Sequence, residues 1–190
     1  MPIKLAILGI LLEKDMHPYE IRTIMKDRSL DRNAKMQIGS LYYAVEQLCK
    51  QGSIEAVEVI KSSNRPDKTV YRITDKGKIY FEKLLLRMFE EIEPVCRPIY
   101  TALAFAWKGD QEKIAAILKK RILEAEHQVN YLYEVYRSHI GTVPRSVLHL
   151  MAGNYEHAKT ELNWLKRLYK DAAAGQLNQY GGDPVLDEND

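Results

Sequence analysis

The chain has 190 residues, enough for one domain or two small ones, and its hydrophobic content of 46% is ordinary for a globular protein with a sizeable core. The formal net charge is only +2, but the charges are unevenly distributed. Residues 22–78 hold twelve Lys and Arg against seven Asp and Glu, whereas residues 93–190 hold twelve against thirteen. A basic first half beside a near-neutral second half indicates one module that faces nucleic acid and one that meets protein or ligand.

Several classes of protein are disfavoured by what the sequence lacks. Its two cysteines, Cys49 and Cys96, form neither a disulfide framework nor a paired metal-binding motif. The N-terminus has no signal-peptide pattern, and no apolar run approaches the roughly 18 residues of a membrane-spanning helix. The five histidines are scattered, and no catalytic triad or glycine-rich phosphate loop is visible. We therefore expect a cytoplasmic protein that is not an enzyme, needs no metal or cofactor and does not enter a membrane.

The first two predicted elements are helices. Residues 3–12 are too apolar for a surface helix, so we expect this helix to be buried. Pro18 suits the first turn of a second helix. The inward face of that second helix is predicted to carry Ile21, Ile24 and Met25. Residues 27–35 are polar and form the turn before the next element.

Residues 36–52 predict a third helix with two different faces. Four apolar residues recur at steps of three and four along it and therefore share one side: Ile38, Leu41, Val45 and Leu48. The other side carries hydrogen-bonding and cationic groups and one glycine, with Tyr42 on the flank: Gly39, Ser40, Tyr43, Gln47 and Lys50. Gly52 stands where a helix needs a left-handed residue to stop.

Two strands follow this helix. Residues 54–59 alternate apolar and polar side chains, and residues 69–74 are β-branched and aromatic, so both stretches favour β-structure. Their connection, residues 61–68, holds turn-forming residues and three cations. A helix followed directly by a β-hairpin with a basic tip is the layout of a winged helix.

The second half of the chain predicts helices only. We expect a helix over residues 78–93, a short apolar one over 97–107, and two long ones over 111–139 and 144–172, with Asp110 as a helix cap. Both long helices carry apolar residues at seven-residue intervals: Leu118, Ala125 and Leu132 in the first, and Leu148, Tyr155, Leu162 and Tyr169 in the second. Helices of about 40 Å beside a small domain cannot bury both seams within one chain, so we expect a homodimer.

Nine residues of the third helix and the hairpin are candidates for contact with double-stranded DNA. A helix fits the major groove, where Gln reads adenine and Ser bonds a base or a phosphate. Glycine permits close backbone approach, a helix N-terminus favours a phosphate, and cations at a wing tip suit the phosphates or the minor groove. The candidates are Lys35, Gln37, Gly39, Ser40, Tyr42, Tyr43, Gln47, Arg65 and Lys68. The alternatives are a solvated polar face with an ordinary hairpin, or a winged helix that binds another protein. Salt-sensitive binding to duplex DNA separates them.

Aromatic residues in the second half suggest a ligand site. Aromatic rings bind planar aromatic molecules by stacking, and Tyr and Trp also supply hydrogen bonds. The candidates for binding a small aromatic effector are Tyr100, Trp107, Tyr155 and Trp164, with Phe105 nearby in the sequence. The alternative is that these rings pack within a helical interface, which is the common use of aromatic residues at helical spacing.

The third helix and hairpin resemble the PadR family of transcriptional regulators. The matching residues, in order, are Gly39-Ser40-Leu41-Tyr42, Leu48, Gly52, Ile54, Arg65-Pro66, Tyr71, Thr74 and Gly77. The second helix keeps Tyr19, Glu20 and Ile21 but has Pro18 where the family has glycine. Residues 153–165 are similar to the C-terminal dimerisation region of the longer PadR subgroup, so the resemblance spans about residues 3–170.

The resemblance implies a mostly α fold and a function. We expect a winged helix-turn-helix domain with a small β-hairpin in residues 1–93 and a long-helix dimerisation and effector domain in residues 94–174. Residues 175–190, poor in apolar groups, are expected to be a disordered tail. The function that the resemblance implies is transcriptional repression, through binding of a homodimer to a palindromic operator.

Overall fold

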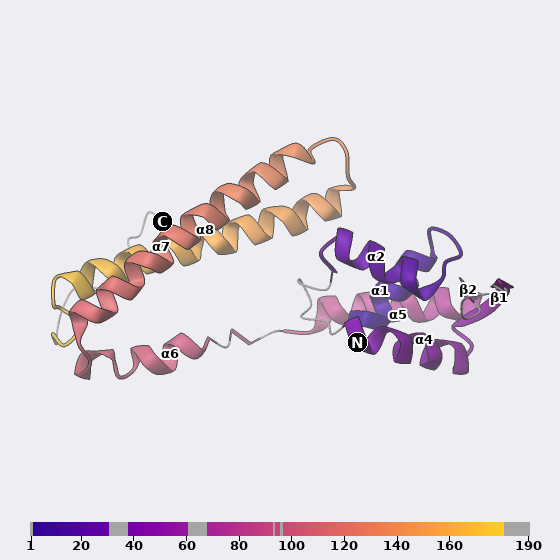
Figure 1. Ribbon diagram of the computed structural model, residues 1–190, viewed down its shortest axis with the longest axis horizontal. Coiled ribbons are helices and arrows are strands. Elements are labelled where there is room, and N and C mark those ends of the chain that lie inside the picture. Colours follow the sequence, from indigo (N-terminus) through magenta and orange to yellow (C-terminus); the bar gives the residue numbers. More distant parts are fainter. Residues whose placement is uncertain (1, 31–37, 61–67, 93, 96, 181–190) are drawn as a thin grey trace. The chain divides into compact units, whose positions relative to one another are not determined.

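The computed structural model of the protein describes residues 2–30, 38–60, 68–92, 94–95 and 97–180 and is mostly helical with one β-hairpin (Figure 1). The chain divides into two compact units, residues 1–94 and 95–190. The elements of the first unit are α1 (Pro2–Leu11), α2 (Pro18–Asp27), the 3-10 turn η1 (Ile38–Ser40), α4 (Leu41–Lys50), β1 (Ile54–Ile60), β2 (Lys68–Ile73) and α5 (Asp75–Glu90).

The core of the first unit forms around α1, which packs against α2, α4 and α5. The fully buried side chains of this core come from α1, α2, α4 and β1. They include Ile7, Leu8, Ile21, Met25, Leu41, Leu48 and Ile54. Gly9 lets α1 approach α5 closely, because a Cβ there would lie 3.2 Å from a ring carbon of Phe81. The predicted buried first helix is confirmed.

A capping interaction fixes the start of α2. The His17 side chain accepts a hydrogen bond from the Tyr19 N–H (3.1 Å), and the Glu20 carboxylate accepts one from the His17 N–H (3.0 Å). These reciprocal bonds satisfy backbone donors that have no partner inside the helix. The predicted helix start at Pro18 is therefore confirmed, and His17 adds a capping role that the sequence analysis did not assign.

The β-hairpin is antiparallel and holds a third chain segment at one edge. Ile54 pairs with Ile73 at the end away from the connection of the two strands, and the register shifts between Ala56 and Glu58, which is a β-bulge. On the other side of β2, Met16 and Tyr71 exchange backbone hydrogen bonds of 3.1 and 3.0 Å. The hairpin, which would be marginal alone, is thus tied to the turn between α1 and α2.

The same turn is joined to β2 by an ion pair. The Arg72 guanidinium donates to the Asp15 carboxylate, with Nε 2.9 Å from Oδ2. This hydrogen bond holds the pKa of the Asp15 carboxyl below its ordinary value. Arg72 is therefore engaged within the protein, on the turn that the Met16 bridge also holds.

The end of α4 and the start of α5 are locked together. Gly52 has φ +73°, and the Gly52 and Ser53 N–H groups bond the carbonyls of Cys49 and Leu48, which is a glycine-terminated helix end. The Thr74 hydroxyl donates to the Gly52 carbonyl (2.7 Å) and accepts from the Gly77 N–H (3.1 Å), capping α5. The predicted left-handed stop at Gly52 is confirmed, and α5 begins at Asp75 rather than 78 because of this cap.

The second unit consists of α6 (Pro98–Leu103), the 3-10 turn η2 (Ala106–Lys108), α7 (Gln111–Ser138) and α8 (Arg145–Ala173). The two long helices lie side by side and form an antiparallel hairpin (Figure 1). The Asp110 carboxylate accepts from the Lys113 N–H (3.1 Å), so the predicted cap is confirmed. The single helix expected over 97–107 is wrong: it breaks after Leu103, with Phe105 outside helical geometry (φ −117°, ψ 1°).

The hairpin is buried at one end only. Its buried side chains lie near the start of α7 and the end of α8, and they are Ala115, Leu118, Leu162, Leu165 and Ala172. Toward the loop the seam residue Leu132 and its apolar neighbours Val129 and Met151 stay half-exposed. One chain therefore covers only part of the two apolar seams.

The chain continues beyond α8 along the base of the hairpin. Leu177 packs on the buried cluster there, and its N–H donates to the Gln111 side-chain oxygen (3.0 Å). The disordered tail expected from residue 175 is thus wrong as far as residue 180, since Leu177 supplies an apolar anchor, while residues 181–190 lie outside the described residues. In the part of the chain that the structure describes, no helix has the length and apolarity needed to span a membrane.

Candidate nucleic-acid interface

The buried side of α4 fixes which of its side chains face solvent. Leu41, Ala44, Val45 and Leu48 are all buried in the core of the first unit. Of the predicted inward face, Leu41, Val45 and Leu48 are confirmed, and the side chain of Ile38 lies outside the described residues. The opposite side of the helix is therefore free to meet a partner.

The exposed side of α4 is aromatic, polar and charged. Tyr42 and Tyr43 are 52% and 66% exposed, and Glu46 and Lys50 are exposed beside them. Gln47 is half-buried at the flank of this face. Because residues three and four apart are neighbours on a helix, Tyr43, Glu46 and Lys50 form one row along its centre.

Gly39 and Ser40 lie in the 3-10 turn that precedes α4, and both are exposed. A Cβ at Gly39 would meet no atom of the described chain within 4 Å, so packing inside the unit does not require glycine there. An open backbone at the start of a helix is a position that a phosphate can approach.

Two charged residues of this face, Glu46 and Lys50, were not among the nine candidates for DNA contact. Glu46 Oε1 lies 2.5 Å from Lys50 Nζ, one helical turn further on. The hydrogen bond that the Lys50 ammonium donates to the Glu46 carboxylate raises the pKa of Lys50. The signal in the sequence was an acid four residues before a lysine, the spacing of an intrahelical ion pair.

Four other candidates for DNA contact have side chains outside the described residues. Lys35, Gln37 and Arg65 lie outside the described residues, and so does the side chain of Lys68, although its backbone begins β2. Contact of the wing tip with DNA therefore remains a prediction.

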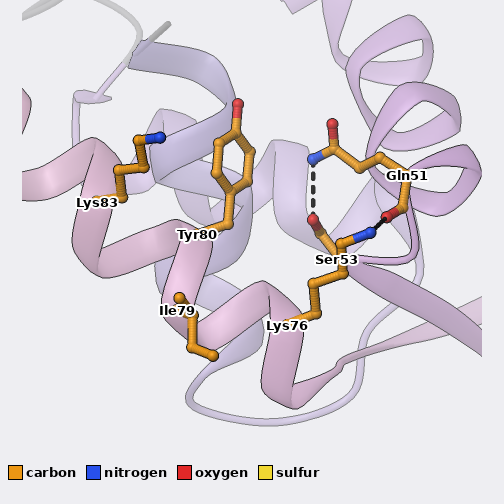
Figure 2. Close-up of a pocket in the computed structure, with 6 residues that line it drawn as sticks. All are labelled: Gln51, Ser53, Lys76, Ile79, Tyr80 and Lys83. Atoms are coloured by element: carbon orange, nitrogen blue, oxygen red, sulfur yellow. Dashed lines mark hydrogen bonds between the residues drawn. The ribbon is translucent and has the colours of Figure 1, made fainter.

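A shallow hollow of about 290 Å³ lies behind the end of α4 (Figure 2). The Gln51 amide donates to the Ser53 hydroxyl (2.9 Å), and Lys76 Nζ donates to the Gln51 carbonyl (2.5 Å). Ile79, Tyr80 and Lys83 of α5 complete the lining. The hollow contains none of the candidate DNA-contacting residues, and the Lys76 bond within it links α5 to the end of α4.

The four candidate effector residues do not all come together. Tyr100 and Trp164 form an edge-to-face pair with ring centroids 5.9 Å apart, whereas Tyr155 packs on Tyr133 at 5.3 Å. Tyr155 and Trp164 are nine positions apart on α8, about 13 Å along the helix. Trp107 lies under Lys108 Nζ at 4.7 Å and lines a separate hollow with residues 177–180. Of the four candidate residues, only Tyr100 and Trp164 are in contact with each other.

A cluster of charged residues also joins elements of the second unit. Glu161 of α8 forms ion pairs with Arg97, which precedes α6, and with Arg121 of α7 (3.3 Å). The group ties the three helices of the second unit together. Among the described residues, no group of three or more His, Cys, Asp or Glu side chains is placed to hold a metal ion.

Among the described residues of the first unit, the helices α1, α2 and α4, the last with an exposed polar face, and the two-stranded wing that follows define a winged-helix domain. Residues 7–83 match the family described as the transcriptional regulator PadR-like family, so the chain carries a domain of that family. This match covers the domain from α1 into α5 and confirms the resemblance seen in the sequence.

Solved structures of PadR-like regulators share the fold over both units. Bacillus subtilis PadR in complex with operator DNA is 18% identical, with a TM-score of 0.76 over 90% of this chain and 99% of that chain. The same protein in complex with p-coumaric acid is also 18% identical, with a TM-score of 0.75 over 91% and 99%. The Vibrio cholerae virulence activator AphA is 16% identical, with a TM-score of 0.67 over 90% and 98%. No curated protein sequence matches this chain.

Proposed function

We propose that this PadR-like regulator is a repressor that binds a palindromic operator as a homodimer. The first unit would bind DNA, and the second would join the two copies. The observation that carries the proposal is the exposed face of α4, where the row of Tyr43, Glu46 and Lys50, flanked by the half-buried Gln47, lies opposite a fully buried apolar face. A helix of this kind can place three or four side chains against base edges in the major groove. The operator complex of Bacillus subtilis PadR supports the same use of the fold.

The proposal makes a prediction about Gln47. Gln47→Ala should narrow the affinity gap between operator and random duplex, because a base contact typically discriminates by about 1–3 kcal/mol. Folding should be unaffected, since the side chain is not part of the core. Fluorescence titration of both duplexes, at several salt concentrations, measures the gap. Gln128→Ala, an exposed position of α7, is the control. Equal loss of affinity for both duplexes would mean that Gln47 contacts a phosphate rather than a base.

The half-exposed seams of α7 and α8 support assembly through the second unit. Val129, Leu132 and Met151 leave apolar area that a second hairpin can cover. Sedimentation of the full chain at micromolar concentration should give a dimer, and Val129→Glu should shift it toward monomer. Gln128→Glu adds the same charge at an exposed neighbour and should leave the dimer intact. A monomer that still binds a palindrome tightly would contradict the proposal.

An aromatic effector is the finer part of the proposal. Tyr100 and Trp164 offer two aromatic rings in contact. Glu161, one turn of α8 before Trp164, forms ion pairs with the cationic side chains of Arg97 and Arg121. The complex of Bacillus subtilis PadR with p-coumaric acid supports this part of the proposal. A hydroxycinnamic acid added to the duplex titration should release the DNA, and no release would count against this part.

A further inference from the structure

Glu46 lies at the centre of the exposed face of α4. Tyr43 precedes it by three residues, and Lys50 follows it by four, so the three side chains are neighbours along one row. The Lys50 and Glu46 side chains are 65% and 56% exposed, with Nζ 2.5 Å from Oε1. An ion pair so open to water contributes little to stability, because water and salt compete for both groups. Stability of α4 therefore does not account for an acid at this place.

An acid on a DNA-facing helix acts against binding unless a base donates to it. Phosphates repel a carboxylate, and this repulsion is the same at every sequence. In the major groove, cytosine presents the N4 amino group as a donor. The amino group of adenine is also a donor, but the N7 acceptor beside it faces a second carboxylate oxygen unfavourably. Cytosine is therefore the base that a groove-facing glutamate selects.

We propose that Glu46 is a specificity residue that selects a cytosine in each half-site and restrains Lys50 until that cytosine is found. The inference rests on the proposed function, since it assumes that α4 enters the major groove. In the free protein Glu46 holds Lys50. On the operator the carboxylate accepts from the cytosine N4 amino group, and the released ammonium moves to a phosphate. On random DNA both groups stay paired, and Lys50 adds no phosphate contact.

The charges around Glu46 agree with this exchange. The pKa of Lys50 is raised by its bond to Glu46, so the ammonium stays charged before it is released. Glu46 also contributes, after burial and Cys49, to raising the pKa of Tyr71 on β2. A lysine side chain is long and flexible enough to change partner without movement of the helix.

The test is selection of binding sites by the full-length protein from duplexes with a randomised central segment. The wild-type protein should recover a motif with a cytosine at one position of each half-site and should discriminate against thymine there by about 5- to 150-fold. Glu46→Ala should lose the preference at that position only. Glu46→Gln should change it to adenine, because an amide bonds the N6 and N7 groups of adenine together.

A matched variant separates base selection from a general effect of charge. Glu82→Gln removes one negative charge from an exposed position of α5 in the same unit. It should recover the wild-type motif. An unchanged motif for both Glu46 variants overturns the inference, and so does the same change of motif with Glu82→Gln. Failure of the wild-type protein to bind any duplex would instead overturn the proposed function, so the two failures are distinguishable.

Discussion

Gly77→Ala is expected to lower the free energy of unfolding of the first unit by about 3 kcal/mol, the upper end of the usual effect of overpacking. An added Cβ would lie 2.0 Å from the Ser53 carbonyl oxygen and 2.7 Å from Ile73 Cγ1. The carbonyl cannot easily move away, because it accepts the Thr74 N–H at 3.1 Å. Relief of the clash would require α5 to separate from the end of α4.

Urea unfolding followed by circular dichroism measures this effect. Gly153→Ala is the matched control, because a Cβ at this glycine in α8 would meet no described atom within 4 Å. Alanine there should stabilise the helix by up to about 1 kcal/mol. If both variants unfold at the same urea concentration, the close approach of Gly77 to Ser53 does not exclude a larger side chain at position 77.

Leu41→Ala is expected to destabilise the first unit by about 2–5 kcal/mol, because it removes buried methyl groups and leaves a cavity. Leu41 is fully buried in the centre of the core at the first turn of α4. Its neighbour Tyr42 is 52% exposed, so Tyr42→Ala should change stability by no more than about 0.5 kcal/mol.

Thermal melting of the two variants tests how α4 is oriented. A normal melting curve for Leu41→Ala together with early melting of Tyr42→Ala would mean that the buried and exposed faces are exchanged. The pair also separates stability from DNA recognition, because only the exposed face is proposed to touch bases.

The elements themselves could be predicted from the sequence because their signals are local. The periodicity of Leu41, Val45 and Leu48 and the stop at Gly52 depend on residues within one helix. The bridge between Met16 and Tyr71 joins segments far apart in the sequence and could not be seen in this way. The break at Phe105 was missed because a continuously apolar stretch has no period to interrupt.

The order of Thr74 and Gly77 was recognised as a family pattern, and the structure supplies its physical cause. Thr74 caps α5 and bonds the carbonyl of Gly52, while Gly77 leaves room for the Ser53 carbonyl. Each contact links two elements, so the sequence shows which residues are present but not what they touch.

The exposed face of α4 was predicted almost correctly, with one instructive difference. From the sequence, Gln47 was predicted to lie on this face and Glu46 was not. The structure buries Ala44 together with the larger apolar residues, which turns the exposed face toward Glu46 and leaves Gln47 half-buried. Alanine was not counted as an apolar anchor because it is small, although a helix that packs closely can bury it well.

The wing has a further consequence for the behaviour of concentrated protein. In the part of the chain that the structure describes, β1 pairs only with β2, so its second edge is open. An open strand edge can recruit strands from other molecules, and charged side chains and bulges oppose this. Glu55 and Glu58 are exposed on β1, with the bulge between Ala56 and Glu58. The strand therefore presents a bent, acidic edge that disfavours edge-to-edge aggregation.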